Sequence, residues 1–365
     1  MIRRTLAIAV KEFLHLRRDW RTSLALLGMP MVLLLIYGFA LSFDVQHIRL
    51  AVVDRDGSRA SRDLLASFLS SGYFDLTDFR RDLSHLPHAF DSEEIQAALV
   101  IPSDLGAALA AGRQTSVQFL LDGSDSLTAT TILGTARQIV AATSPPLVLD
   151  TAPVQARVLV AYNPDLLSSR FLVPGLLAFI LMVTSVIATA LAVVREKERG
   201  TVESLRATPV LAVELLLGKT LPYLLVAATA AAGSLTLARA LFDVPIRGSL
   251  LWLAGVTLLF LAGGLAWGVL ISTLADSQQV AFQVGLLSSM LPTLLLSGFI
   301  FPISSMPKAI QVVTNLVPAR YFLVALRSIV LKGTGPSGWW VQAVALAVFA
   351  GVVLALATAR TVRSL

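Results

Sequence analysis

Charged and hydroxylated side chains are concentrated in residues 195–209, whose sequence is REKERGTVESLRATP. The segment follows an apolar run, residues 171–194, and precedes another one. Carboxylates alternate with cations along it, and anionic lipid would repel the carboxylates. The pattern therefore favours docking of a soluble partner through a charged helix that ends at Pro209; an ordinary interfacial helix is the alternative. The residues concerned are Arg195, Glu196, Lys197, Glu198, Arg199, Gly200, Thr201, Glu203 and Pro209.

Other patterns that could carry chemistry are weak. Gly218-Lys219-Thr220 ends like a phosphate-binding loop, but that loop needs a glycine where the chain has Val213. We therefore expect no ATP site here, so ATP chemistry would come from a partner. The chain has no cysteine and only four scattered histidines, so we predict no catalytic residue, cofactor site or metal site. Since the apolar runs hold no obvious central carboxylate, a proton-coupled exporter is only an alternative.

The composition is typical of an integral membrane protein. Hydrophobic residues occupy 56% of the 365 positions and charged residues only 14%, whereas a soluble domain carries roughly a quarter charged residues. The formal net charge is +6, but the cations flank apolar runs, so we expect no nucleic-acid partner. The first 22 residues are polar and basic and precede a full-length apolar run. This favours a retained signal anchor over a cleaved signal peptide.

Six apolar segments are long enough to cross a bilayer as helices. They are residues 23–43, 171–194, 219–241, 249–274, 280–301 and 339–359. Basic clusters precede the first segment, follow the second and follow the last. An even number of spans separates successive clusters, so the positive-inside rule can place all of them in the cytoplasm. We therefore expect a multi-pass protein with both termini, including the tail at 360–365, in the cytoplasm.

Residues 44–170 would then form a domain outside the cytoplasm, between the first and second spans. They contain fifteen acidic residues and ten arginines but no lysine. Strand-like runs alternate with helix-like runs, which is typical of a small α/β domain. The strands are expected at 49–54, 98–102, 117–123 and 154–163, and the helices at 58–72, 103–112 and 124–143. Ser103 is the expected N-cap of the second helix. The predicted fold is a polytopic α-helical membrane protein with an α/β extracytoplasmic domain.

Two further segments are predicted to lie at the membrane surface. Residues 1–22 favour an amphipathic helix in the cytoplasmic interface, in contact with lipid, with a disordered basic tail as the alternative. Its candidate contact residues are Lys11, Glu12, Phe13, Arg17 and Arg18. Residues 302–338 hold two helix-like pieces broken at Pro318, and neither is long enough to span, so we expect interfacial or re-entrant helices on the outer side. The residues of interest there are Pro302, Pro307, Pro318, Arg320, Tyr321 and Arg327.

Several of these segments resemble one family. REKERGTVESLRATP followed by VLAVELLLGK is similar to the cytoplasmic signature of the type 2 ABC exporter permeases. SGFIFPISSMP (297–307) and NLVPARYFLVALRSIVLKG (315–333) resemble its outer re-entrant region and C-terminal signature. The runs VVDRDGSRASRDLLASFLSSGYFDL and VIPSDLGAALAAG…VQFLLDGSDS resemble the large outer domain of the bacterial multidrug-exporter-like branch. One departure is Val324, where the family commonly has a polar or acidic residue.

The resemblance implies a function and a set of partners. It implies a permease subunit, in the bacterial inner membrane, of an ATP-driven exporter for a hydrophobic or amphipathic substrate, drug-like or lipid-like. Two permeases, identical or sister subunits, would associate with two separately encoded subunits that bind ATP and Mg. Residues 195–209 would couple to these ATPases, with the N-terminal helix as a second contact. A periplasmic adaptor and an outer-membrane channel are possible further partners in this branch. A membrane scaffold or sensor with a ligand-binding outer domain is the alternative from another class.

Overall fold

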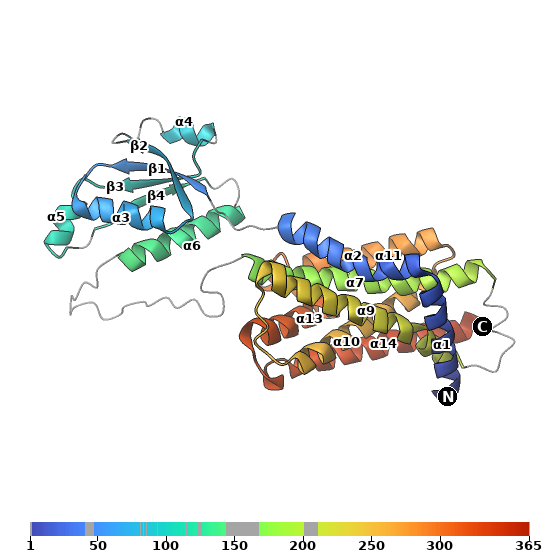
Figure 1. The fold of residues 1–365 in the computed structure, drawn as a ribbon. Coiled ribbons are helices and arrows are strands. Elements are labelled where there is room, and N and C mark those ends of the chain that lie inside the picture. Colours follow the sequence, from blue (N-terminus) through green and yellow to red (C-terminus); the bar gives the residue numbers. More distant parts are fainter. Residues whose placement is uncertain are drawn as a thin grey trace. The chain divides into compact units, whose positions relative to one another are not determined.

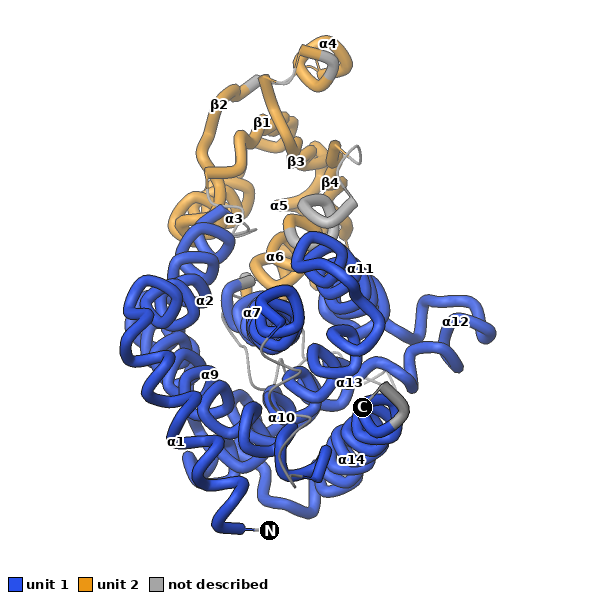
Figure 2. The backbone as a smooth tube through the Cα atoms, turned by 90° about the vertical axis from the view of Figure 1, so that its right-hand side faces the viewer, with its two compact units in different colours: residues 1–42, 159–365 blue, residues 43–158 orange. Residues whose placement is uncertain are grey.

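The computed structural model describes residues 2–40, 47–80, 82, 84, 86–92, 94–113, 115–122, 126–143, 168–200 and 211–364. The chain divides into two compact units, which are treated separately below. Unit 1 comprises residues 1–42 and 159–365, and unit 2 comprises residues 43–158. Figure 1 labels their elements in chain order, and Figure 2 colours the two units.

Unit 1 is a bundle of long helices. They are α1 (Ile2–Arg18), α2 (Trp20–Ala40), α7 (Ser168–Glu198), α9 (Ala212–Phe242), α10 (Leu250–Leu274), α11 (Gln278–Leu296) and α14 (Trp340–Ser364). All of these except α1 are long and apolar enough to cross a membrane, which confirms the six predicted spans. The observed ends differ from the predicted ones by up to seven residues. Helix α9 begins at Ala212 rather than 219, and α11 ends at Leu296 because Gly298 adopts a left-handed φ of 80°.

Helix α7 lies at the centre of unit 1. Figure 2 shows it surrounded by α2, α9, α10 and α11, with which it makes contacts. Two thirds of its most apolar stretch (67%) is buried within the chain, against 17% for α2 and 22% for α11. Glycines of α10 allow its close packing: a Cβ on Gly268 would lie 2.2 Å from the Val186 carbonyl oxygen, and one on Gly264 would lie 2.4 Å from Ser185 Oγ. These glycines therefore serve packing within one chain.

A bent helical pair connects α11 to α14. It consists of α12 (Lys308–Val313) and α13 (Pro318–Arg327), which continues into a wider π-type turn at Ser328–Lys332. The two halves of the pair are bent by 85° at the break. Short 3-10 turns lie at Ile303–Ser305, Thr314–Leu316 and Pro336–Gly338. The break falls at Pro318, as the sequence predicts, because proline has no N–H to donate and is well suited to the first turn of α13.

Unit 2 is a small α/β fold. Its strands are β1 (Ile48–Asp54), β2 (Phe74–Arg80), β3 (Ala97–Ile101) and β4 (Gln118–Leu121), in the order β2-β1-β3-β4. Strand β1 runs parallel to β2 and β3, and β4 runs antiparallel to β3. The helices are α3 (Arg59–Ser70), α4 (Leu86–Asp91), α5 (Leu105–Ala110) and α6 (Ser126–Thr143). Leu50, Phe68 and Leu99 are fully buried between the sheet and its α3 and α6 side.

The elements of unit 2 follow the sequence pattern with three exceptions. Ser58 caps α3 by accepting a hydrogen bond from Ser61 N. The cap predicted at Ser103 is wrong, because α5 begins one residue later with Asp104 as its N-cap. Strand β2 and the short helix α4 were not expected from the sequence. The strand predicted at 154–163 lies outside the described residues.

Candidate coupling site at the end of helix α7

Four consecutive charged residues, Arg195 to Glu198, form the last turn of α7. Successive side chains on an α-helix are turned by about 100°, so four in a row point in four directions. On a surface helix some of them would face water. Because α7 is central in unit 1, each of these side chains contacts a neighbouring element, although Lys197 and Glu198 also remain exposed.

On one side of this turn, Glu196 forms a buried ion pair with α9. Lys219 Nζ donates a hydrogen bond to Glu196 Oε2, and the two side chains are only 8% and 17% exposed. Glu12 of α1, 6% exposed, lies in the same cluster. Burial first, and then the negative charge of Glu196, raises the pKa of Glu12 above its ordinary value of 4.5. Lys219 thus pairs with the carboxylate of Glu196 and lies near that of Glu12, whose Oε1 is also 3.9 Å from Lys11 Nζ.

Gly218 brings α1 close enough to α9 for this cluster to form. A Cβ at Gly218 would lie 2.7 Å from Ile8 Cβ and 2.9 Å from the Thr5 carbonyl oxygen, both on α1. A second link lies one turn away, where Arg4 Nη1 is 4.0 Å from Glu214 Oε2. The tripeptide that resembles a phosphate loop therefore has a packing role and a charge-pairing role. Lys219 was not predicted to be a functional residue, although a lysine buried near the start of an apolar helix needs an acidic partner.

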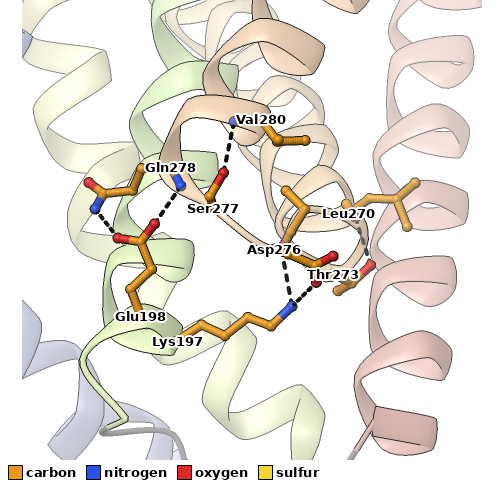
Figure 3. A network of polar contacts seen from close by, with 9 residues as sticks. Lys197, Glu198, Leu270, Thr273, Asp276, Ser277, Gln278 and Val280 are labelled. Carbon is orange, nitrogen blue, oxygen red and sulfur yellow. Dashed lines mark hydrogen bonds and ion pairs between the residues drawn. The ribbon is translucent and has the colours of Figure 1, made fainter.

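On the opposite side, the same turn of α7 is bound to the start of α11 (Figure 3). Glu198 accepts hydrogen bonds from Gln278 N at 2.7 Å and from Gln278 Nε2. A carboxylate at this position is stabilised by the positive end of the α11 dipole. Lys197 Nζ donates to the Ala275 carbonyl oxygen at 3.0 Å and to Asp276 Oδ1 at 3.3 Å. These contacts fix α7 to the turn between α10 and α11.

Arg195 completes the arrangement by reaching the junction of α1 and α2. Its Nη1 lies 3.7 Å from Asp19 Oδ2, and its Nε donates to Gln278 Oε1 at 3.5 Å. Hydrogen bonds from Thr22 are the main reason that the pKa of Asp19 is lowered. We call Glu12, Arg195, Glu196, Lys197, Glu198, Lys219 and Gln278 the α7 hub.

The charged segment does not continue as one helix to Pro209, so that prediction is wrong. Helix α7 ends at Glu198, and Gly200 has a left-handed φ of 70°, which is a usual helix stop. The side chain of Glu196 faces Lys219, and Arg199 is exposed. Thr201, Glu203 and Pro209 lie outside the described residues. Residues 195–198 are thus engaged within the chain.

The N-terminal segment is a helix, α1, rather than a disordered tail. It turns Ala9, Glu12 and Leu16 toward the rest of unit 1. Its apolar residues Leu6 and Phe13 are 60% and 49% exposed. Lys11, Arg17 and Arg18 are also exposed. The helix therefore presents an apolar and basic face to its surroundings, while its buried glutamate joins the α7 hub.

The candidate residues of the bent pair stabilise its shape. Arg320 Nη1 donates to Asn315 Oδ1 at 2.8 Å, and Tyr321 Oη donates to the Asn315 carbonyl oxygen at 2.8 Å. Arg327 lies over the Phe171 ring at 4.1 Å and donates to the Phe171 carbonyl oxygen at 3.2 Å. Pro302 and Pro307 immediately precede the first 3-10 turn and α12. These residues lie apart from the α7 hub in the chain's contacts, at the other ends of α7 and α11.

Six helices long and apolar enough to span a membrane define a polytopic membrane protein, and the α7 hub links the end of its central helix to neighbouring helices. Comparison with known proteins identifies its family. The model of the ABC-2 family transporter proteins matches residues 20–359, so the chain belongs to this family.

Curated relatives agree with this assignment. The chain is similar to the probable multidrug ABC transporter permease YbhS of Escherichia coli, with 35% identity over 92% of this chain and 90% of that protein. It is 28% identical to the probable multidrug ABC transporter permease YbhR of the same organism, over 91% of each chain. It is also 27% identical to the Escherichia coli inner membrane transport permease YhhJ, over 95% of this chain and 97% of that protein. The chain is a membrane permease subunit of an ABC exporter and not itself an ATPase. The scaffold and proton-coupled alternatives are thereby set aside.

Proposed function

We propose that this permease exports a hydrophobic or amphipathic substrate, drug-like or lipid-like, and that the α7 hub transmits the movement of partner ATPases to the spans. The α7 hub carries this proposal, because it links α1, α9, α11 and the α10–α11 turn to the end of the central helix. The family implies ATP-binding partner subunits. In our proposal these subunits bind ATP and Mg.

The proposed transmission has two parts with different residues. The ATPase contacts residues 199–209 and the exposed face of α1. Residues 199–209 include charged residues that follow α7 in the sequence, and α1 exposes Lys11, Arg17 and Arg18. The α7 hub then passes the displacement on, since a buried ion pair resists separation of the helices it joins. A two-state movement of the bundle needs such rigid links between elements.

The topology we propose has both termini in the cytoplasm, with the α7 hub on that side and unit 2 in the periplasm. The support is the clustering of arginine and lysine in α1, at the end of α7 and at the end of α14. The substrate would pass between two permeases, identical or sister subunits, lined by α2, α7 and α11. The names of two relatives include multidrug transport, which supports an apolar cargo. We keep a periplasmic adaptor and an outer-membrane channel as proposed partners of unit 2, on the resemblance of its sequence.

Two single variants separate docking from transmission. We expect Glu203→Lys to reduce co-purification of the ATPase. Glu198→Gln, whose side chain contacts α11 within the chain, should leave co-purification intact and reduce substrate-stimulated ATP hydrolysis. If both variants co-purify with the ATPase and both retain full stimulation, this assignment of the segment is wrong.

A further inference from the structure

A deep groove lies between α9 and α10, at the ends of these helices that are remote from the α7 hub. Its volume is about 650 Å³. Ala228, Ala231, Ala232 and Leu235 of α9 form one wall, and Leu250, Leu253, Ala254 and Thr257 of α10 form the other. Arg239 lies at its end, close to the connection between the helices.

The backbone holds this groove open. Arg247 N, in the connection between α9 and α10, donates to the Val330 carbonyl oxygen at 3.0 Å. A Cβ on Gly248 would lie 2.6 Å from the Ile329 carbonyl oxygen. The connection is therefore fixed against the turn that follows α13, which keeps α10 from closing onto α9. The groove is a property of the fold and not of one side-chain rotamer.

The α9 wall of the groove consists mainly of small side chains that lie on one face of the helix. Positions 228, 231, 232, 235 and 239 follow the spacing that places residues on one side of a helix. Small alanine side chains therefore lead along the groove to one arginine. A flexible hydrocarbon chain fits such a channel, and bulky wall residues would fill it. Leu250, which lines the groove, is 67% exposed, as expected for a surface that faces lipid.

Two polar groups in the groove have no partner among the described residues. The exposed side chain of Arg239 makes no hydrogen bond or ion pair there. Thr257 is only 5% exposed, and its hydroxyl oxygen is buried without a hydrogen bond. Measured from the helix ends at 1.5 Å per residue, Thr257 lies about 6 Å deeper than Arg239. A glycerophospholipid has polar atoms at two such depths, in its phosphate and in the ester groups nearer its acyl chains.

We propose that this groove binds an anionic glycerophospholipid, with its phosphate on Arg239, an ester group near Thr257 and an acyl chain along the alanine wall. The guanidinium suits a phosphate because it can donate two parallel hydrogen bonds. The lipid would fasten α9, and through Lys219 the α7 hub, to the surrounding bilayer. The site itself depends on the groove alone; its position in the outer leaflet rests on the topology proposed above.

The test titrates the delipidated full-length permease in detergent with phosphatidylglycerol and measures bound lipid by native mass spectrometry. Phosphatidylglycerol should bind about ten-fold more tightly than a diacylglycerol with the same chains, since the charge-assisted contact is absent there. Inorganic phosphate should not compete. Competition by inorganic phosphate alone, or equal binding of the two lipids, would overturn the proposal.

Three variants give the test its controls. Arg239→Gln should weaken phosphatidylglycerol binding about ten-fold, and Ala232→Phe should obstruct the groove from an exposed position. Arg247→Gln removes an exposed arginine from the adjacent connection, outside the groove lining, and should bind like the wild type. If Arg239→Gln binds as the wild type does, or if Arg247→Gln weakens binding equally, the lipid does not bind at Arg239. Thermal unfolding without lipid verifies that each variant is folded. ATPase co-purification is a separate readout, so failure here leaves the proposed function standing.

Discussion

At the scale of single residues, the central feature is a buried lysine that pairs with one carboxylate and lies near a second. Lys219, Glu196 and Glu12 come from α9, α7 and α1, and all are largely buried. Glu12 is buried beside the carboxylate of Glu196, and its ion pair with Lys11 is long, at 3.9 Å, so the ionised form of Glu12 is costly. The raised pKa of Glu12 follows from that arrangement. Protonation of Glu12 leaves Lys219 and Glu196 as a neutral pair.

This predicts a pH dependence that belongs to Glu12. Below pH 4.5, its ordinary pKa, the carboxyl is protonated in both the folded and the unfolded chain. As the pH rises, the unfolded chain releases the proton first, so the folded state loses stability until the pH passes the raised pKa of Glu12. The loss is about 1.4 kcal/mol for each unit between the two pKa values. Unfolding midpoints measured from pH 4 to 8 should therefore fall in the wild type relative to Glu12→Gln; parallel profiles would refute the assignment.

Removal of the shared lysine should be costly for the same reason. Lys219→Met is expected to destabilise unit 1 by about 3 kcal/mol, because Glu196 would keep its buried charge without a partner. The matched control is Lys308→Met, at an exposed lysine of α12, which should change the unfolding midpoint little. In a double-mutant cycle with Glu196→Gln, we expect a coupling of about 1–3 kcal/mol. Additive effects of the two substitutions would mean that the pair does not interact.

Little of this residue-level picture was predictable from the sequence. The charge alternation in residues 195–198 predicted docking of a soluble partner, which stays a prediction; the structure shows these four side chains in contact with other elements of the chain. The partners could not be found, because Lys219, Asp276 and Gln278 are close to α7 only through helix packing. We predicted no phosphate loop at Gly218-Lys219-Thr220, and that prediction left Lys219 without a role. A buried-charge argument applied to the start of α9 would have predicted that Lys219 has an acidic partner.

At the scale of elements, the position of α1 depends on one glycine. The backbone of α1 approaches Gly218 so closely that any side chain there would meet Ile8 and the Thr5 carbonyl oxygen. Helix α1 carries the inward-facing Glu12 and an exposed apolar face. The packing of α1 on α9 therefore determines whether Glu12 lies near Lys219.

We predict that Gly218→Leu displaces α1 without preventing membrane insertion. The ATPase should then co-purify in reduced amount, and the stability difference between the wild type and Glu12→Gln should disappear in the Gly218→Leu background. Gly255→Ala is the control, since nothing lies within 4 Å of a Cβ at that position; it should stabilise α10 by roughly 1 kcal/mol. Retention of the Glu12 effect in Gly218→Leu would show that α1 does not depend on Gly218.

Element boundaries were predictable where the signal was local. Pro318 and Ser58 begin α13 and α3 as their residue types indicate. The error at the end of α7 arose because charge alternation was given more weight than Gly200, whose left-handed conformation stops the helix. Strand β2 was missed because three of its seven residues are charged, so its apolar alternation is weak. It is held in place by parallel pairing to β1, a long-range contact.

At the scale of the whole molecule, the protein consists of six potential spans, the α7 hub at one end of them and a separate α/β unit. The number of spans and the family were predictable because the apolar runs are long and the motifs occur in order. The sides of the membrane follow from charge clustering alone and therefore need a direct measurement.

Cysteine labelling can provide that measurement, because the sequence contains no cysteine and an introduced one would be the only thiol. We predict that Thr77→Cys, at an exposed position of β2, reacts with a membrane-impermeant maleimide once the outer membrane is permeabilised. Arg18→Cys, at an exposed position of α1, should react only after the inner membrane is also opened. The reverse pattern of labelling would invert the topology and place the α7 hub on the wrong side for an ATPase.

The central claim is that the α7 hub transmits the work of the ATPase to the spans. The most direct measurement is substrate-stimulated ATP hydrolysis by the complex reconstituted with Lys219→Met, alongside wild type and Lys308→Met. Assays run below the unfolding temperature, with ATPase stoichiometry checked by gel filtration. We expect the Lys219→Met permease to keep its bound ATPase subunits but to lose most of the stimulation of ATP hydrolysis by substrate. The Lys308→Met permease should behave like the wild type. Full stimulation in the Lys219→Met complex would contradict the central claim.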